Sequence, residues 1–239
     1  MAKTSWKPGN MIYPLPAVMV TCRDKGQDNI ITIAWTGTIC TNPPMTYISV
    51  RPERHSYEMI KNSGEFVINL TTKQLTRATD FCGVRSGRDV DKFKEARLTK
   101  EEAQVVDAPI IAESPVNIEC KVEKIVPLGS HHMFMAKVVN IMVDDDYMED
   151  NGRFALEKTN PLIYSHGGYY ETGKKLVWGD EELPAVKHYG RCYIEPNIQL
   201  PAKLPSNKVN AKLVLKLTEN GLPVSENEYN LLLADKKWN

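Results

Sequence analysis

The alternation of apolar and polar residues along the chain predicts a series of short β-strands. The clearest case is 116–123, where every second residue is apolar. Turn-forming residues separate the strands, and the two prolines Pro43 and Pro44 end one of them because proline cannot donate to a ladder. The predicted strands are 15–24, 30–40, 46–51, 65–70, 116–123 and 133–143.

Three short helices are predicted between these strands. Ser56 is expected to cap the first helix, which ends before Gly64. The second helix is predicted to begin at the capping box Thr71-x-x-Gln74, and the third at Thr99-x-x-Glu102. One face of the second helix carries the residues expected to be buried, namely Leu75, Ala78, Thr79 and Cys82.

Many short strands with helices between them favour a mainly β protein with inserted helices (α+β), built on an antiparallel barrel rather than a parallel sheet. We expect one domain over 1–180 and a C-terminal extension, 181–239, that packs on the barrel or on a partner subunit. Within the extension only 209–217 and 229–233 have a regular pattern, and the stretch 184–205 has none.

The predicted strand 133–143 is apolar on both faces for most of its length. One face can line the barrel interior, and the other needs a second cover. Pairing of two copies about a two-fold axis is the commonest solution, so a homodimer is expected. The alternative is that the extension covers this face and the chain stays monomeric.

Composition and charge exclude several classes of function. Lys and Arg together number 30, and so do Asp and Glu, so the positive surplus of a nucleic-acid or membrane-surface protein is missing. No apolar run is long enough to span a bilayer, and no signal-type segment opens the chain, so a cytoplasmic protein is expected. The five cysteines have no paired spacing, which argues against disulfides and Cys-x-x-Cys sites.

Two possible ligand motifs do not meet their requirements. The segment 168–175 resembles a phosphate loop, but Lys175 stands where Ser or Thr would bind magnesium. The acidic run that begins at Asp144 lacks the ligand spacing of a calcium loop, and we interpret it as a solvated turn. We therefore expect no metal site.

Segment 29–38 is the first candidate binding segment. Small and hydroxyl-bearing residues surround Trp35 on a strand followed by a bend, which would allow a planar ligand to approach closely. The alternative interpretation is a threonine-rich edge strand with Trp35 in the core.

The second candidate begins at Arg51 and includes Arg54, His55 and Ser56 at a predicted helix start. Backbone N–H groups and the helix dipole favour an anion there. The alternative is an ordinary serine cap with exposed basic neighbours. A ligand with both a flat ring and a phosphate would explain both segments.

The chain resembles the flavin reductase-like family of FMN-binding split barrels, and it is most similar to the flavoredoxin branch. The resemblance runs from about residue 14 to 179. It rests on several motifs in one order: N-I-I-T-I-A-W-T-G-T-I-C-T-N-P-P (29–44), R-H-S-Y-E-M-I-K-N-S-G-E-F-V-I-N-L (54–70), S-G-R-D-V-D-K-F (86–93), E-S-P-V-N-I-E-C (113–120), L-G-S-H (128–131) and Y-S-H-G-G-Y-Y (164–170).

This resemblance implies an antiparallel Greek-key split β-barrel with FMN along 32–38 and the phosphate near His55 and Ser56. It also implies a substrate side near His131 and Tyr164, and it assigns no catalytic side chain. The implied cofactor-binding residues are Asn29, Thr32, Ile33, Ala34, Trp35, Thr36, Gly37, Thr38, Arg51, His55, Ser56, Cys82, Gly83, Arg85, Ser86 and Lys92.

The implied function is an oxidoreductase that passes reducing equivalents from NADH or NADPH through FMN to an acceptor. One alternative is a flavoredoxin-type electron carrier that docks protein redox partners. A third possibility is a barrel that binds a non-flavin ligand or has a structural role, since one fold hosts several functions.

Overall fold

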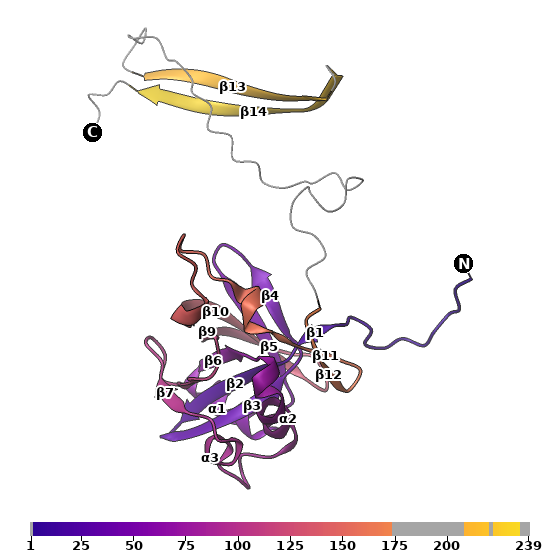
Figure 1. Cartoon of the computed structure of the whole chain (residues 1–239), viewed down its shortest axis with the longest axis vertical. Coiled ribbons are helices and arrows are strands. Elements are labelled where there is room, and N and C mark those ends of the chain that lie inside the picture. The colour runs from indigo at the N-terminus through magenta and orange to yellow at the C-terminus, as the bar shows by residue number, and fades with distance from the viewer. Residues whose placement is uncertain (1, 174–207, 220–221, 235–239) are drawn as a thin grey trace. The chain divides into compact units, whose positions relative to one another are not determined.

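The structure is a computed structural model that describes residues 2–173, 208–219 and 222–234 (Figure 1). The chain divides into two compact units, Met1–Lys175 and Leu176–Asn239, which we describe one at a time. The predicted boundary at residue 180 and the proline-rich stretch 184–205 lie outside the described residues.

The first unit is mostly antiparallel β-sheet with a few short helices (Figure 1). In chain order its elements are β1 (Leu15–Pro16), β2 (Val18–Asp24), β3 (Gln27–Ile33), β4 (Thr36–Cys40), β5 (Met45–Val50), α1 (His55–Ser63), β6 (Glu65–Leu70), the 3-10 turn η1 (Lys73–Leu75), α2 (Thr76–Val84), α3 (Lys92–Ala96), β7 (Lys100–Glu102), β8 (Pro109–Ile111), β9 (Val116–Pro127), β10 (His132–Val143), η2 (Asp145–Tyr147), η3 (Leu156–Thr159), β11 (Leu162–Ser165) and β12 (Gly168–Glu171).

The main sheet has seven strands in the order β3-β2-β6-β9-β10-β5-β4. Its two edge strands, β3 and β4, are consecutive in the chain and are separated only by Ala34 and Trp35. The sheet must therefore curl until its edges meet at this bend, which produces a split barrel. The prediction of a single strand over 30–40 is wrong. The segment forms two strands, β3 and β4, because at Ala34 and Trp35 the chain passes from one edge of the sheet to the other.

The barrel interior is filled by apolar side chains from most of the strands, among them Val20, Ile48, Phe66 and Phe134. Helix α1 contributes Tyr57, Met59 and Ile60 to the same core. The helix ends as predicted at Gly64, whose φ of 71° is left-handed and whose N–H donates to the Ile60 carbonyl at 2.9 Å.

Helices α2 and α3 cover the outer face of β2 and β3. The face predicted to be buried is confirmed, since Leu75 at the end of η1 and Ala78, Thr79 and Cys82 in α2 are all buried.

Both predicted capping boxes are wrong. The Thr71 hydroxyl donates to the Ala17 carbonyl on a neighbouring segment instead of a helix N–H. The N–H of Thr99 donates to the Glu113 carboxylate at 2.9 and 3.1 Å, and the chain then continues into strand β7, not into a helix. In both cases a distant partner replaces the local one that the pattern assumed.

Residues 100–111, which we call the strap, cover the second face of part of the sheet. Glu119 on β9 is 0% exposed and accepts the N–H groups of Gln104, Val105 and Val106 at 2.6–3.1 Å. The carboxylate thus fixes three consecutive peptide groups of the strap. Strap residues such as Val106 and Ile110 then pack against Val67 and parts of β10.

The strap covers part of the second apolar face of β10. A register shift between Val138 and Asn140 places Val139 and Met142 together against the strap, so strict alternation does not hold along the strand. Ile141 and Val143 stay exposed, at 54% and 37%. The strap is therefore one cover that the sequence pattern did not identify, and the homodimer remains a prediction.

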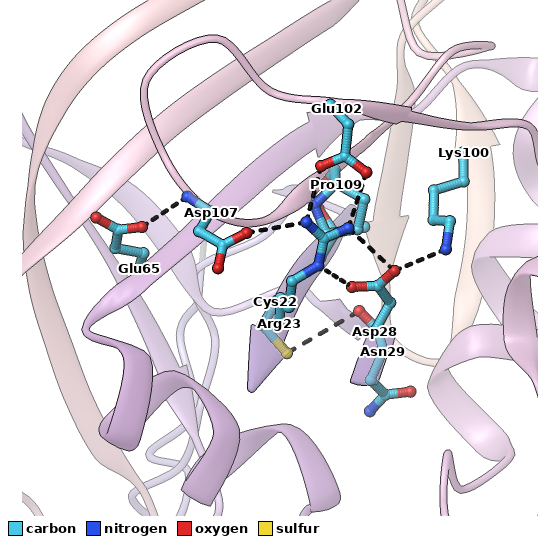
Figure 2. Close-up of polar contacts among 10 residues, drawn as sticks. Cys22, Arg23, Asp28, Asn29, Glu65, Lys100, Glu102, Asp107 and Pro109 are labelled. Atoms are coloured by element: carbon cyan, nitrogen blue, oxygen red, sulfur yellow. Dashed lines mark hydrogen bonds and ion pairs between the residues drawn. The ribbon is translucent and has the colours of Figure 1, made fainter. Parts of the chain in front are cut away.

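Arg23 on β2 ties the strap to the β2–β3 hairpin (Figure 2). Its guanidinium pairs with both carboxylate oxygens of Glu102 at 2.8 and 2.9 Å, and with Asp28 at 2.6 Å. Asp107 accepts a further bond at 2.9 Å, and Lys100 reaches Asp28 at 2.8 Å. The Arg23 side chain is 17% exposed, so this network lies partly out of water.

A small sheet, β1-β11-β12, joins the beginning of the first unit to its end. Leu15 pairs with Tyr164 and Pro16 with Ile163. In the second unit, β13 (Lys208–Glu219) and β14 (Leu222–Ala234) form an antiparallel hairpin, and the two stretches with a regular pattern, 209–217 and 229–233, lie within these strands. Throughout the described residues the helices are too short and polar to span a bilayer.

Candidate functional site

A cavity of about 370 Å³ opens where β3, the start of α1, the end of α2 and α3 meet. We call it the cationic cavity, because its lining includes five basic side chains and a single carboxylate, Glu53. The basic residues are Arg51, Arg54, Arg85, Arg88 and Lys92. Such a set of donors favours an anion with several oxygens.

Helix α1 begins at His55 beside this cavity, and no side chain caps it. Its N-terminal N–H groups and dipole therefore add to the positive potential. The predicted cap is wrong: Ser56 lies within the helix, is buried, and accepts a hydrogen bond from the Asn29 side-chain amide at 2.8 Å.

Lys92 reaches the cavity from α3, although it is only 5% exposed. Its ammonium donates to the carbonyls of Ile30 at 2.6 Å and Cys82 at 2.8 Å, which leaves one of its three protons for a ligand. Burial, assisted by the charge of Arg54, lowers the pKa of Lys92 to about 8. Burial, together with the charges of Arg88 and Lys92, also lowers the pKa of His55.

Two buried cysteines near the cavity are unsuited to nucleophilic chemistry. Burial raises the pKa of Cys82 to about 11 and that of Cys22 to about 12. Both thiols are therefore protonated at neutral pH, and the thiolate is the reactive form. Cys82 contributes packing and its backbone carbonyl.

The loop 85–88 passes so close to β3 that residue 87 has no room for a side chain. A Cβ at Gly87 would lie 2.1 Å from the Asn29 side-chain oxygen. Asn29 thus lies between this loop on one side and Ser56 of α1 on the other. It sets the spacing of two walls of the cationic cavity.

A second cavity of about 420 Å³ adjoins the first, since Ile31, Arg51, Arg54 and Gly83 line both. We call it the aromatic cavity. Its ring-bearing lining residues are Tyr13, Trp35, His131, Tyr164 and Tyr169.

His131 and Tyr169 have defined neighbours in the aromatic cavity. The His131 ring lies 4.2 Å from Trp35, and its Nδ1 is 3.0 Å from the Ser130 hydroxyl. Burial and the charges of Arg51 and Arg54 lower the pKa of His131. Burial and the carboxylate of Asp80 raise the pKa of Tyr169 to about 12.

Most of the residues predicted for a binding site meet at these two cavities. Those in the cationic cavity are Asn29, Arg51, His55, Ser56, Cys82, Gly83, Arg85, Ser86 and Lys92, and those in the aromatic cavity are Thr32, Ile33, Ala34, Trp35, His131 and Tyr164.

Three predicted residues, Thr36, Gly37 and Thr38, line neither cavity. The Thr36 hydroxyl donates to the Tyr47 carbonyl at 2.6 Å, and the Gly37 carbonyl accepts from Thr46 at 2.9 Å. They belong to the β4–β5 ladder, because the bend at Trp35 turns the chain away from the cavities.

The sequence reasoning missed several lining residues, chiefly Tyr13, Asp80, Arg88 and Tyr169. Arg88 and Tyr169 lie within the family motifs 86–93 and 164–170, so the resemblance could have identified them. Tyr13 and Asp80 reach the site only through the β1–β11 pairing and the packing of α2.

Together the two cavities fit a ligand that has an anionic group at one end and a flat ring at the other. The donors of the cationic cavity match a phosphate, and the small residues Ala34 and Gly83 leave room against the aromatic walls. In the described part of the chain, no group of three His, Cys, Asp or Glu side chains is placed to hold a metal ion.

Comparison with known proteins identifies relatives of the first unit. The family model of the flavin reductase like domain matches residues 10–173. A protein of Aeropyrum pernix is 30% identical over 155 residues, which cover 64% of this chain and 58% of that protein, less than two thirds of its length.

Two solved structures share the fold. Flavoredoxin of Desulfovibrio vulgaris (Miyazaki F) is 30% identical with a TM-score of 0.70, and the match covers 74% of this chain and 97% of that one. A Shewanella frigidimarina protein with a split barrel domain is 22% identical with a TM-score of 0.63, covering 70% and 86%. The curled seven-stranded sheet is thus a split barrel, and the chain belongs to the flavin reductase-like domain family.

Proposed function

We propose that this chain binds FMN across the two adjoining cavities. The observation that carries the proposal is their continuity: a cavity rich in cations and helix N–H groups opens directly into one walled by aromatic rings. When bound, FMN supplies the hydride and electron chemistry of its ring, and the protein supplies binding, orientation and access.

In this arrangement the residues divide into two roles. His55, Lys92 and the arginines around them hold the phosphate, with the N-terminus of α1 adding its dipole. Ile33, Ala34 and Trp35 would lie along the ring, and His131 and Tyr164, which line the same cavity, would face the second substrate. Since burial keeps the thiols of Cys22 and Cys82 protonated, no cysteine nucleophile is assigned, and the role proposed for the protein is to bind and orient the flavin and the substrate.

The proposed activity is an NADH- or NADPH-dependent flavin reductase that passes reducing equivalents to an acceptor. A cytoplasmic location and a homodimer are part of the same proposal. The proposed activity is supported by membership of the flavin reductase-like family and by the His131 and Tyr164 rings in the aromatic cavity, which lie where a nicotinamide would approach the flavin ring.

The proposal is tested by titrating the purified chain with FMN and, as the matched control, riboflavin. We expect about one FMN per chain and riboflavin affinity at least tenfold lower, since each charge-assisted hydrogen bond contributes roughly 1.5–3 kcal/mol. Equal affinity for the two flavins would contradict the assignment of the cationic cavity to phosphate.

A second candidate, a flavoredoxin-type electron carrier, is favoured by the 30% identity to a protein with that name. Steady-state oxidation of NADH and NADPH separates the two. A reductase oxidises the nicotinamide rapidly with free FMN in excess, whereas a carrier turns over only with a protein partner. A purified protein without flavin colour that takes up no FMN would instead support a non-flavin ligand or a structural role.

A further inference from the structure

The cationic cavity carries more positive charge than one phosphate neutralises. Its five basic side chains and its single carboxylate leave a net of four positive charges. The N-terminus of α1 adds to this potential. A phosphate monoester such as that of FMN carries about −1.5 to −2 at pH 7. About two positive charges therefore remain for a second anion in the proposed complex.

Arg51 is the basic residue placed next to the aromatic cavity by the sheet itself. It directly follows β5, whose last residue, Val50, pairs with His132 at the start of β10. Arg51 and His131 are therefore the next residues outward at this end of the β5–β10 ladder. Both line the aromatic cavity, and Arg51 lines the cationic cavity as well. Arg51 thus lies where the two cavities join.

The histidines at the two ends of the proposed site respond to different cations. Burial and the charge of Arg51 lower the pKa of His131, which lies at the ring end. Burial and the charges of Arg88 and Lys92 lower the pKa of His55, which lies at the phosphate end. The positive charge of Arg51 therefore acts at the ring end, in agreement with its position on the ladder.

The guanidinium of Arg51 is accessible to a ligand. Its side chain is 51% exposed, and its ion pair within the described residues is with Glu53, at 3.5 Å, whose side chain is 65% exposed. An exposed pair at this distance contributes little to stability. The planar fork of N–H donors can therefore turn to the oxygens of a bound phosphate.

We infer that Arg51 binds the 5′-phosphate of the second substrate, a dihydronicotinamide nucleotide whose ring lies in the aromatic cavity beside His131. A single ribose separates this phosphate from the nicotinamide ring, so neighbouring residues can contact both groups at once. NADH and NADPH both carry the phosphate, and Arg51 therefore selects nucleotides over the phosphate-free riboside without choosing between these two. The inference rests on the proposed function, because it requires FMN in the cavities and a nicotinamide as the reductant.

The test follows reduction of bound FMN in the full chain by anaerobic stopped flow. The reductants are dihydronicotinamide riboside, which has no phosphate, its mononucleotide, which has one, and NADH. All three carry the same reacting ring, so the limiting rate of reduction should be similar. The half-saturating concentration in the wild type should be at least about fivefold lower for the mononucleotide than for the riboside. This is less than a buried charge-assisted hydrogen bond would give, because Arg51 is half exposed. Added salt should reduce the difference.

Two variants, each loaded with saturating FMN, assign this preference to a residue. Arg51→Met should raise the half-saturating concentrations of the mononucleotide and of NADH and leave that of the riboside unchanged. The matched control is Arg77→Met, which removes the same charge from an exposed position on α2 that lines neither cavity. The control should keep the wild-type preference.

The outcomes separate this inference from the proposed function. A wild type that does not prefer the mononucleotide to the riboside would overturn the inference and leave the proposed function intact. The same holds if Arg51→Met weakens all three reductants equally, or if Arg77→Met loses the preference as well. A chain that binds no FMN, or whose bound FMN none of the three reductants reduces, would overturn the proposed reductase together with the role of Arg51.

Discussion

Replacing Gly87 with alanine tests how closely the loop 85–88, beside the cationic cavity, is fitted to strand β3. The new methyl group would lie 2.1 Å from the Asn29 side-chain oxygen and 2.6 Å from its carbon, whereas ordinary contacts are about 3.5–4.0 Å. The loop or the amide must therefore move by more than 1 Å. Turning Asn29 away breaks its bond to Ser56, which costs about 0.5–1.5 kcal/mol, and overpacking costs about 1–3 kcal/mol.

We expect Gly87→Ala to lower the free energy of unfolding by about 2–4 kcal/mol, measured by urea denaturation, and to weaken FMN binding at least tenfold. Gly83→Ala is the matched control in the same cavity. Its methyl would lie 3.3 Å from the Thr32 Cβ, and helix α2 gains about 0.5–1 kcal/mol from alanine, so its stability should change by less than about 1 kcal/mol. If Gly87→Ala is as stable as wild type, the close approach of loop and strand is not a constraint.

The other predictions concern buried charges. Lys92→Met should weaken FMN binding at least tenfold at pH 7. In calorimetric titrations the affinity of the wild type for FMN should fall as pH rises through about 8, where Lys92 loses its proton, and the variant should show no such fall. Glu119→Gln should destabilise the fold by about 2–4 kcal/mol in urea, because in either orientation its NH2 group would face two hydrogen-bond donors, Val105 and Val106 at one oxygen position or Gln104 and Asn140 at the other. Although burial opposes it, hydrogen bonds from Asn140 and the strap lower the pKa of Glu119. Its stabilisation is therefore present above about pH 4.3 and lost as pH falls through the depressed value, so variant and wild type should converge in acid. Arg23→Met should destabilise by about 1–2 kcal/mol, with a smaller difference in 1 M salt; a difference that salt does not change would argue against a charge-based role.

The bounds of several elements could be predicted because the signal is local. The bounds 65–70 of β6 and the glycine end of α1 match the structure, since alternation and a left-handed glycine depend on neighbouring residues only. The capping assignments failed where the polar side chain found a partner distant in sequence. Thr71 bonds to Ala17, and Ser56 to Asn29.

The candidate site could be predicted where its residues fall in contiguous motifs, and much less where the topology assembles it. Trp35 and Lys92, which the family resemblance implies as cofactor-binding, line the two cavities, but the motif that includes Trp35 continues into β4, which leaves the cavity. The strap likewise could not be predicted from local pattern. Alternation predicts that Glu119 faces solvent, yet it is buried beneath residues 104–106. No pattern in β9 alone contains that information.

The pairing of β1 with β11 has a consequence for the order of events during synthesis. Leu15 and Tyr164 are nearly 150 residues apart, so pairing them closes most of the first unit into one loop. The loss of chain entropy on closing this loop must be offset by contacts that have already formed. Tyr13 and Tyr164 can face the aromatic cavity only after this step. On a growing chain the cavity therefore stays incomplete until the ribosome has passed β11. We accordingly expect a bound cofactor to enter a finished barrel and not to serve as the nucleus around which the barrel folds.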